Sequence, residues 1–396
     1  MFKLNHIKND FYGGTTTAVV ALPLALAFGV TSGIGAIAGL WGAIILGFLA
    51  SLFGGTKSQI SGPTSPMTIV MSGIVLTYNN ELDLIFTIVV LTGLIQILFG
   101  ILRIGKYIQY VPSPVISGFV TGIGCIIIII QFGPMLGHQL KGKIFDILQN
   151  LMIINNINND SLIIGMIGLF ILLIYPKRFN KFIPSPLICL FIGILLSYYF
   201  FTNAITLREI PVGLPGFISF NMPLSKVPFM FFSAFILALL GSVDSLITSL
   251  IADKATNTKH NSNKELIGQG IGNTISGLFG ALPGAGATMR TMVNIKSGGE
   301  TNLSGMIHAL LLLGVVLGLA PLAEIIPNSI LAGILIKIGW DIIDWDYIKN
   351  FKNEKVTNYC LMLFVLFLTV FIDLIIAVFS GIVLYWIVNL INKKLK

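Results

Sequence analysis

The chain has 396 residues, of which 55% are apolar and only 10% are charged, and its mean hydropathy is +0.92. Soluble proteins carry roughly 25% charged residues, so this composition excludes a soluble globular fold. The net charge of +8 does not indicate a nucleic-acid partner, because the Lys and Arg residues lie between long apolar runs and form no patch. A lipid bilayer is the solvent that suits such a chain.

Apolar stretches follow one another along the whole chain. About 20 apolar residues cross a hydrocarbon core of roughly 30 Å, so the chain has room for about 12 to 14 spans and for no sizeable soluble domain. Three stretches are short or interrupted by Gly, Pro and Thr, namely 59–78, 286–295 and 327–343. We predict fourteen spans, at 12–33, 35–53, 59–78, 83–102, 108–132, 161–176, 183–202, 227–251, 265–282, 286–295, 303–323, 327–343, 356–375 and 377–392.

The basic residues support the count of fourteen. Cytoplasmic loops of membrane proteins are enriched in Lys and Arg. With a cytoplasmic N-terminus and fourteen crossings, eighteen basic residues fall inside and four fall outside, namely Lys141, Lys143, Arg208 and Lys226. Omitting any weak span would invert every later loop and spoil this asymmetry. We therefore expect both chain ends on the cytoplasmic side of a bacterial inner membrane, or on the stromal side of a plastid membrane.

Two segments repeat each other at a constant offset. Residues 112–124 match residues 327–339 in a proline, a glycine, an isoleucine and a second glycine. They lie in the fifth and twelfth predicted spans, seven apart, so the second copy is inverted in the membrane. A seven-plus-seven inverted repeat is typical of alternating-access transporters.

The predicted fold is thus an all-α polytopic membrane protein of fourteen transmembrane segments in two inverted repeats. Its domains follow from the spans. We expect a cytoplasmic N-terminus at 1–10, a first repeat at 11–203, an external connection at 204–226, a second repeat at 227–392 and a cytoplasmic tail at 393–396.

Two broken segments occupy corresponding places in the two predicted repeats. The third span opens with residues 61–68 and the tenth with residues 283–290, and both are interrupted by Gly or Pro and rich in small or hydroxyl residues. Such a pair is the best indication that a sequence gives of a transport site at the membrane midplane. The alternative is that Gly and Pro allow close helix packing while the hydroxyls cap helix ends.

A helix that begins inside the membrane presents free backbone N–H groups and the positive end of its dipole, which form an anion site without a full charge. In an inverted repeat the third and tenth helices approach the midplane from opposite sides, so two such ends converge on one small anion. Hydroxyl side chains add donors there. The predicted anion site is Thr64, Ser65, Ala287 and Thr288, with Gly62, Pro63, Gly284 and Arg290 as further candidates.

Asp244 is the one acidic residue that we place well inside an apolar run. A carboxylate at that depth costs about 2.5–3.5 kcal/mol even on a lenient insertion scale, so we expect it to have a partner and a task. Thr248 lies one helical turn further along the same face. Together with free carbonyls of the broken segment 284–288, these side chains form an all-oxygen site suited to a hard cation such as Na⁺. Two alternatives stay open, a proton-carrying acid and a salt bridge to Arg290 or Lys337.

Motifs in the first spans resemble the SulP (sulfate permease) family of inorganic-anion transporters. They are residues 10–14, 20–29, 39–41, 53–55 and 59–64, and the similarity continues through 112–124 and 326–339 to cover essentially the whole chain. The resemblance implies a fourteen-segment inverted-repeat fold with core and gate domains, shared with uracil permeases. It also implies an anion site between the N-termini of the third and tenth helices.

Within this family, residues 244–248, 263–266 and 268–273 resemble the BicA-type sodium-dependent bicarbonate transporters. The resemblance implies a sodium site at Asp244, Thr248, Gly286 and Thr288, and a role for Thr64 with the anion. Many relatives that do not use sodium have a different acid at the position of Asp244, so this residue favours sodium coupling. Family members usually continue into a cytoplasmic STAS domain, whereas this sequence ends directly after the last span, so we expect no STAS domain.

We therefore expect a secondary transporter that carries a small inorganic oxyanion, bicarbonate first, inward with Na⁺. No hydrolase elbow, zinc motif or phosphate-binding loop stands in the sequence, so we predict neither an enzyme nor a cofactor other than the co-transported Na⁺. The expected partners are the anion, Na⁺ and membrane lipid, and a homodimer is left open. The alternatives are a sulfate permease driven by protons or by exchange, an anion channel, and a non-transporting membrane scaffold.

Overall fold

The computed structural model describes residues 4–78, 81–106, 112–138, 140, 144–154, 156–176, 185–207, 216–220, 222–350, 356–372 and 374–394. Parts of the predicted external connection, at 208–215 and 221, lie outside the described residues, as do residues 1–3 and 395–396 of the predicted cytoplasmic ends. The basic residues Lys141, Lys143 and Arg208, which enter the predicted orientation, also lie outside them.

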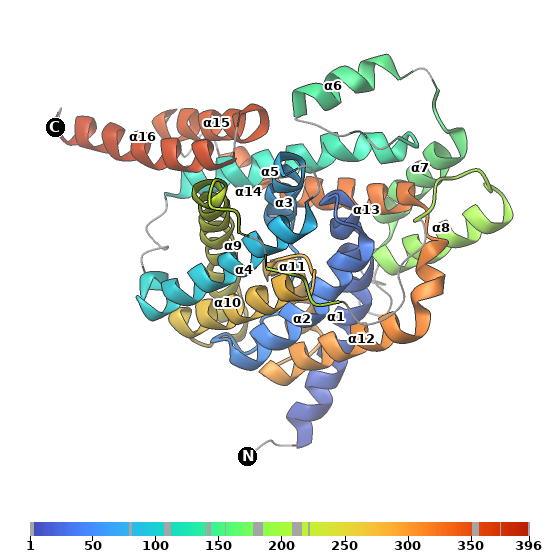
Figure 1. Cartoon of the computed structure of the whole chain (residues 1–396), viewed down its shortest axis with the longest axis horizontal. Helices are drawn as coiled ribbons and strands as arrows, with labels where there is room; N and C mark the ends of the chain where they lie inside the picture. Colours follow the sequence, from blue (N-terminus) through green and yellow to red (C-terminus); the bar gives the residue numbers. More distant parts are fainter. Residues whose placement is uncertain are drawn as a thin grey trace. The chain divides into compact units, whose positions relative to one another are not determined.

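The described chain is helical throughout, apart from one two-stranded sheet and the connections (Figure 1). It divides into two compact units, each built from segments far apart in the sequence. Unit 1 comprises Met1–Ile108, Ile174–Phe200 and Thr206–Pro327, and unit 2 comprises Gln109–Leu173, Phe201–Ile205 and Asn328–Lys396. Each unit therefore takes segments from both predicted repeats.

Unit 1 contains the helices of the candidate site. They are α1 (Leu4–Thr31), α2 (Ala36–Phe53), α3 (Ser65–Thr77), α4 (Leu82–Ile101), the short 3₁₀-helix η1 (Ile104–Lys106), α8 (Ser185–Tyr199), α9 (Val227–Thr256), α10 (Ser262–Leu278), α11 (Thr288–Lys296) and α12 (Asn302–Glu324). α10 packs against both α2 and α4, and its buried glycines, among them Gly268, Gly270 and Gly272, allow these helices to come close. Asn261 is the N-cap of α10, because its side chain accepts a hydrogen bond from the backbone N–H of Lys264.

Unit 2 consists of α5 (Ser113–Met135), α6 (Ile144–Ile153), α7 (Asn159–Ile174), α13 (Asn328–Ile342), α14 (Trp345–Lys349), α15 (Val356–Phe371) and α16 (Leu374–Lys394). α5 packs against α13 and α15. Gly124 of α5 and Gly339 of α13, which match in the sequence repeat, meet backbone to backbone. A Cβ on Gly124 would lie 2.6 Å from the carbonyl oxygen of Gly339, and a Cβ on Gly339 would lie 2.8 Å from that of Gly124.

Each of the fourteen predicted spans overlaps a different α-helix over most of its length. Among the described residues, five helices are long and apolar enough to cross a membrane by themselves, namely α4, α5, α9, α2 and the part of α1 from Ile7 to Thr31. α11 has 9 residues, so it is about 14 Å long and spans less than half of a hydrocarbon core of roughly 30 Å. The predicted third span at 59–78 is wrong at its start, because residues 61–62 form a strand and α3 begins only at Ser65.

Candidate functional site

The two broken segments predicted from the sequence meet in the two-stranded sheet of unit 1. β1 (Ser61–Gly62) pairs antiparallel with β2 (Ala285–Gly286), so that Ser61 lies opposite Gly286 and Gly62 lies opposite Ala285. β1 leads into α3 and β2 leads into α11. Because the strands are antiparallel, the chain leaves the sheet in opposite directions, and the N-termini of the two helices lie next to this junction.

The start of α3 presents donors that the helix itself does not use. Thr64 precedes α3 in an extended conformation, and its side chain makes no capping hydrogen bond. The backbone N–H groups of Ser65 and Met67 have no acceptor within the helix, and Pro66 between them has no N–H. Thr64 and Ser65 are both buried, and the Thr64 hydroxyl has no hydrogen-bond partner among the described residues. A small anion would find two N–H donors and two hydroxyls here.

The start of α11 is similar in form, but the backbone N–H of one residue predicted to bind the anion already donates a hydrogen bond within the protein. Ala287 precedes this helix, and its backbone N–H donates to the carbonyl oxygen of Ile60 at 2.8 Å. Ala287 therefore connects the two broken segments and offers no N–H to an anion. The N–H groups of Thr288, Met289 and Arg290 lie in the first turn and have no acceptor within the helix.

The predicted cation ligands lie on α9 and at the junction. The Thr248 hydroxyl donates to the carbonyl oxygen of Gly286 at 2.9 Å and lies 2.6 Å from the Thr288 hydroxyl. Gly286 is further held by its N–H, which donates to the Ser245 hydroxyl at 3.0 Å. Three oxygens from three elements, α9, β2 and α11, thus form one compact cluster.

Asp244 lies one turn before Thr248 on α9, and the Thr64 side chain is its neighbour. The geometry of this pair falls short of a regular hydrogen bond, since the Thr64 hydroxyl and the buried Asp244 Oδ2 both lack partners among the described residues. Asp244 is thus a carboxylate with an unused oxygen beside both the oxygen cluster and the start of α3. This arrangement suits a bound cation, which would supply the missing partner.

Arg290 does not pair with Asp244 among the described residues. Arg290 is only 1% exposed, and its Nη2 donates to the carbonyl oxygen of Pro63 at 3.3 Å, while Nη1 has no partner within the described part of the chain. The Arg290 charge therefore lies directly behind the first broken segment. Lys337, the other basic residue considered for Asp244, belongs to unit 2 and pairs with Asp341.

A polar stripe on α10 holds both broken segments, and the sequence analysis missed its role. Glu265, Gln269 and Asn273 follow one another at intervals of four residues and are buried. The Asn273 side chain makes two hydrogen bonds with the backbone of Gly284, accepting from its N–H at 2.9 Å and donating to its carbonyl oxygen at 3.0 Å. Gln269 Nε2 donates to the Ser61 hydroxyl at 2.6 Å. The regular spacing of polar residues in a glycine-rich span was the available signal.

Glu265 is a buried acidic residue that the sequence analysis did not single out. Glu265 is 1% exposed, whereas Asp244 is only partly buried. Glu265 lies in the first turn of α10, next to Lys264, and for that reason it has the sequence pattern of a residue at the end of a span. Its burial depends on hydrogen-bond donors from a loop about 210 positions earlier in the chain.

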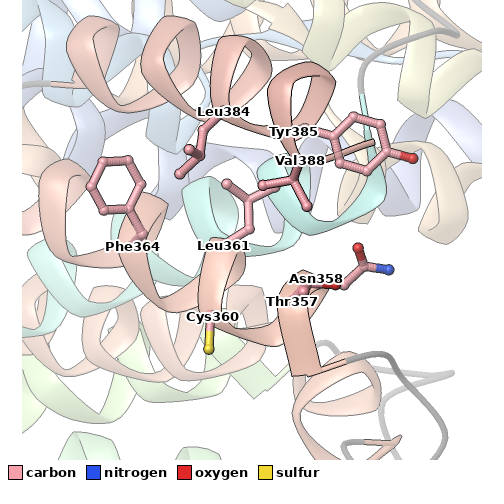
Figure 2. A pocket seen from close by; sticks show the side chains of 8 residues that line it. All are labelled: Thr357, Asn358, Cys360, Leu361, Phe364, Leu384, Tyr385 and Val388. Carbon is pink, nitrogen blue, oxygen red and sulfur yellow. The ribbon is translucent and has the colours of Figure 1, made fainter. Parts of the chain in front are cut away.

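A cavity of about 360 Å³ lies elsewhere, between α15 and α16 of unit 2 (Figure 2). The side chains of Leu361, Phe364 and Leu384 lie along it, and the residues that line it carry no charge. It includes none of the predicted site residues. An uncharged, mainly apolar cavity offers a small ion nothing to replace its water, so we do not assign it to ion binding.

The sequence model of the sulfate permease family matches residues 7–365 of this chain. The chain belongs to the sulfate permease family. Among curated members, the chain is 45% identical over 390 residues to the bicarbonate transporter BicA of Picosynechococcus sp., covering 95% of this chain and 69% of that protein. It is 35% identical over 398 residues to YvdB, a putative sulfate transporter of Bacillus subtilis, covering 98% of this chain and 74% of that protein.

Two solved structures have the same fold as this chain. The transmembrane domain of a cyanobacterial bicarbonate transporter BicA matches with a TM-score of 0.88 and 46% identity, covering 95% of this chain and 98% of that domain. The structure of SLC26A9 matches with a TM-score of 0.88 at 20% identity, covering 99% of this chain and 66% of that protein. The predicted all-α membrane fold of fourteen segments in two inverted repeats is therefore confirmed.

Proposed function

We propose that this chain is a secondary transporter that carries bicarbonate inward together with Na⁺. The observation that carries the proposal is the position of Asp244, whose unpartnered carboxylate oxygen lies beside the Thr248–Gly286–Thr288 oxygen cluster and beside Thr64 at the start of α3. A cation site and an anion site therefore adjoin each other. The names of the relative at 45% identity and of the solved transmembrane domain at 46% identity support bicarbonate over sulfate as the anion.

The anion site consists of the first turns of α3 and α11. Ser65 offers a backbone N–H and a hydroxyl, Thr288 offers a backbone N–H, and Thr64 offers a hydroxyl. Both helix dipoles place their positive ends at the junction, and the buried Arg290 adds a full positive charge behind it. Donors in these positions bind a planar oxyanion through its oxygens.

The cation site consists of Asp244, Thr248, Thr288 and the carbonyl oxygen of Gly286. These are all oxygen ligands, which hard cations prefer. Thr288 belongs to both sites, since its hydroxyl lies in the oxygen cluster while its N–H lies in the first turn of α11. Na⁺ is here a transported ion and not a resident cofactor.

Coupling of the two ions follows from their charges. Without Na⁺, the Asp244 carboxylate repels an anion at the nearby helix ends. For unit charges roughly 6–8 Å apart at an effective dielectric of about 20, this repulsion is about 2–3 kcal/mol. Bound Na⁺ offsets this repulsion, so each ion raises the affinity of the other by the same factor.

The positive-inside pattern supports an orientation with both chain ends on the cytoplasmic or stromal side.

The test is uptake of labelled bicarbonate into vesicles across a controlled Na⁺ gradient. We expect wild-type uptake to require Na⁺, and we expect Asp244→Asn to lower uptake at limiting Na⁺ by about 30- to 100-fold, because the variant loses the charge that attracts the cation. Glu81→Gln is the matched control, since Glu81 is a surface acid paired with Lys226. Sodium-independent uptake by the wild type would overturn the coupling. Labelled sulfate that competes equally with bicarbonate would favour a sulfate permease.

A further inference from the structure

The carboxylate of Glu265 in the first turn of α10 accepts four hydrogen bonds. Its Oε2 accepts from the backbone N–H groups of Gly55 at 2.8 Å and Thr56 at 2.9 Å. Its Oε1 accepts from the side-chain amides of Gln59 at 2.8 Å and Gln269 at 2.8 Å. A buried carboxylate of this kind satisfies its charge entirely with donors. It therefore fixes every group that donates to it.

Gln59 transmits this constraint to α9. Its Nε2 donates to Glu265, and its Oε1 accepts from the Ser249 hydroxyl at 2.9 Å. Ser249 directly follows Thr248, the residue whose hydroxyl donates to the Gly286 carbonyl oxygen. Glu265 decides which end of the Gln59 amide faces which neighbour, because a carboxylate accepts hydrogen bonds and cannot donate them.

The fixed amide of Gln59 lies directly against Gly286. A Cβ on Gly286 would lie 2.2 Å from Gln59 Nε2, so only glycine fits beside this side chain. Gln59 thus forms the wall behind the Gly286 backbone, while Thr248 and Ser245 hold its carbonyl oxygen and its N–H. The position of the Gly286 carbonyl oxygen depends on this wall.

We propose that Glu265 is a positioning residue of the sodium site, which acts through Gln59 to hold the Gly286 carbonyl oxygen within the Thr248–Thr288 cluster. The inference rests on the proposed sodium coupling. It separates Glu265 from Asp244, because Asp244 contacts the cation whereas Glu265 is fully engaged with protein donors and does not. Its loss therefore acts on sodium affinity and leaves the anion donors of α3 and α11 in place.

The experiment measures the apparent KM for Na⁺ and for bicarbonate in Gln59→Ala, Glu265→Gln and the double variant, with Glu81→Gln as the control. We expect Glu265→Gln to raise the KM for Na⁺ by about tenfold, the size expected for one lost buried hydrogen bond, and Gln59→Ala, which loses two such bonds, to raise it by about 30-fold. At saturating Na⁺ the KM for bicarbonate should change by less than about twofold. The double variant should match the worse single variant, because the two residues act in series.

Several results would overturn the inference. An unchanged KM for Na⁺ in Gln59→Ala does so alone, even where Glu265→Gln fails to reach the membrane. Additive effects in the double variant, or equal rises in both KM values, would assign Glu265 a general structural role. Wild-type uptake that does not depend on Na⁺ would instead overturn the proposed coupling, and this inference with it, so the two failures are distinguishable within one series of measurements.

Discussion

The two units join equivalent segments of the two repeats in different ways. In unit 1 the matched broken segments meet through β1 and β2, with Ser61 opposite Gly286. In unit 2 the matched segments 112–124 and 327–339 meet through α5 and α13, at Gly124 and Gly339. Both contacts are reciprocal, as a two-fold relation between the repeats requires.

The backbone makes the difference between the two contacts. α5 and α13 pass through their contact as regular helices, so their backbone groups bond within each helix and the contact provides packing alone. At the β1–β2 junction two helices begin, and their first turns leave N–H groups without helical acceptors. The contact between continuous helices in unit 2 thus provides packing alone. The contact between broken segments in unit 1 provides a candidate ion site.

The largest effect is expected from a substitution that adds a side chain at the β1–β2 junction. Gly286→Ala places a Cβ 2.2 Å from Gln59 Nε2. Gln59 is the end of a flexible side chain, but Glu265 and Ser249 hold it at both ends, so moving it breaks two buried hydrogen bonds. At about 1 kcal/mol each, uptake at limiting Na⁺ should fall roughly 30-fold. Vesicle uptake with protein amounts measured in parallel tests this prediction, and near-normal sodium dependence would contradict it.

The corresponding change in unit 2 should act on stability instead. Gly124→Ala places a Cβ 2.6 Å from the Gly339 carbonyl oxygen, which belongs to a rigid helix backbone. Overpacking of this kind costs about 1–3 kcal/mol, so we expect a lower Tm for the purified protein. The KM values of the protein that does fold should be unchanged. A large rise in the KM for Na⁺ in Gly124→Ala would contradict the distinction between scaffold and site.

A smaller effect is expected from the hydroxyl at the centre of the oxygen cluster. Thr248→Val keeps the shape of the side chain but leaves the Gly286 carbonyl oxygen without the donor that lies 2.9 Å away. We expect the KM for Na⁺ to rise about tenfold, since one ligand and one buried hydrogen bond are lost. Thr248→Ser restores the hydroxyl and should restore the KM. Equal sodium affinity in the Val and Ser variants would remove Thr248 from the site.

Much of this architecture could be predicted from the sequence, because apolar stretches of about 20 residues have few alternatives to membrane helices. The fourteen predicted spans correspond to helices, and the broken segments were recognisable from their Gly and Pro residues. α6 (Ile144–Ile153) and α14 (Trp345–Lys349) were missed, since they are short, carry charged residues and lie in connections between the predicted spans. The roles of the individual site residues stay predictions that only transport measurements test.

Other features depend on contacts that no local pattern encodes. The β1–β2 pair has two residues per strand and joins segments more than 220 positions apart, so neither strand shows a recognisable alternation. The two compact units interleave both repeats, and only tertiary contacts define them. The burial of Glu265 could not be predicted, because two of the donors that satisfy it lie in the distant loop at Gly55 and Thr56.

The smallest effects come from a pair of buried hydroxyls that differ only in their surroundings. Thr64 in unit 1 and Ser117 in unit 2 are 7% and 2% exposed, and neither hydroxyl has a hydrogen-bond partner among the described residues. Thr64→Val should raise the KM for bicarbonate a few-fold, because this hydroxyl serves the ions. Ser117→Ala should leave transport unchanged and change the free energy of unfolding by less than about 1 kcal/mol, since removing an unpaired hydroxyl loses no bond. Equal transport by both variants would show that an unpaired buried hydroxyl marks no ion site in this fold.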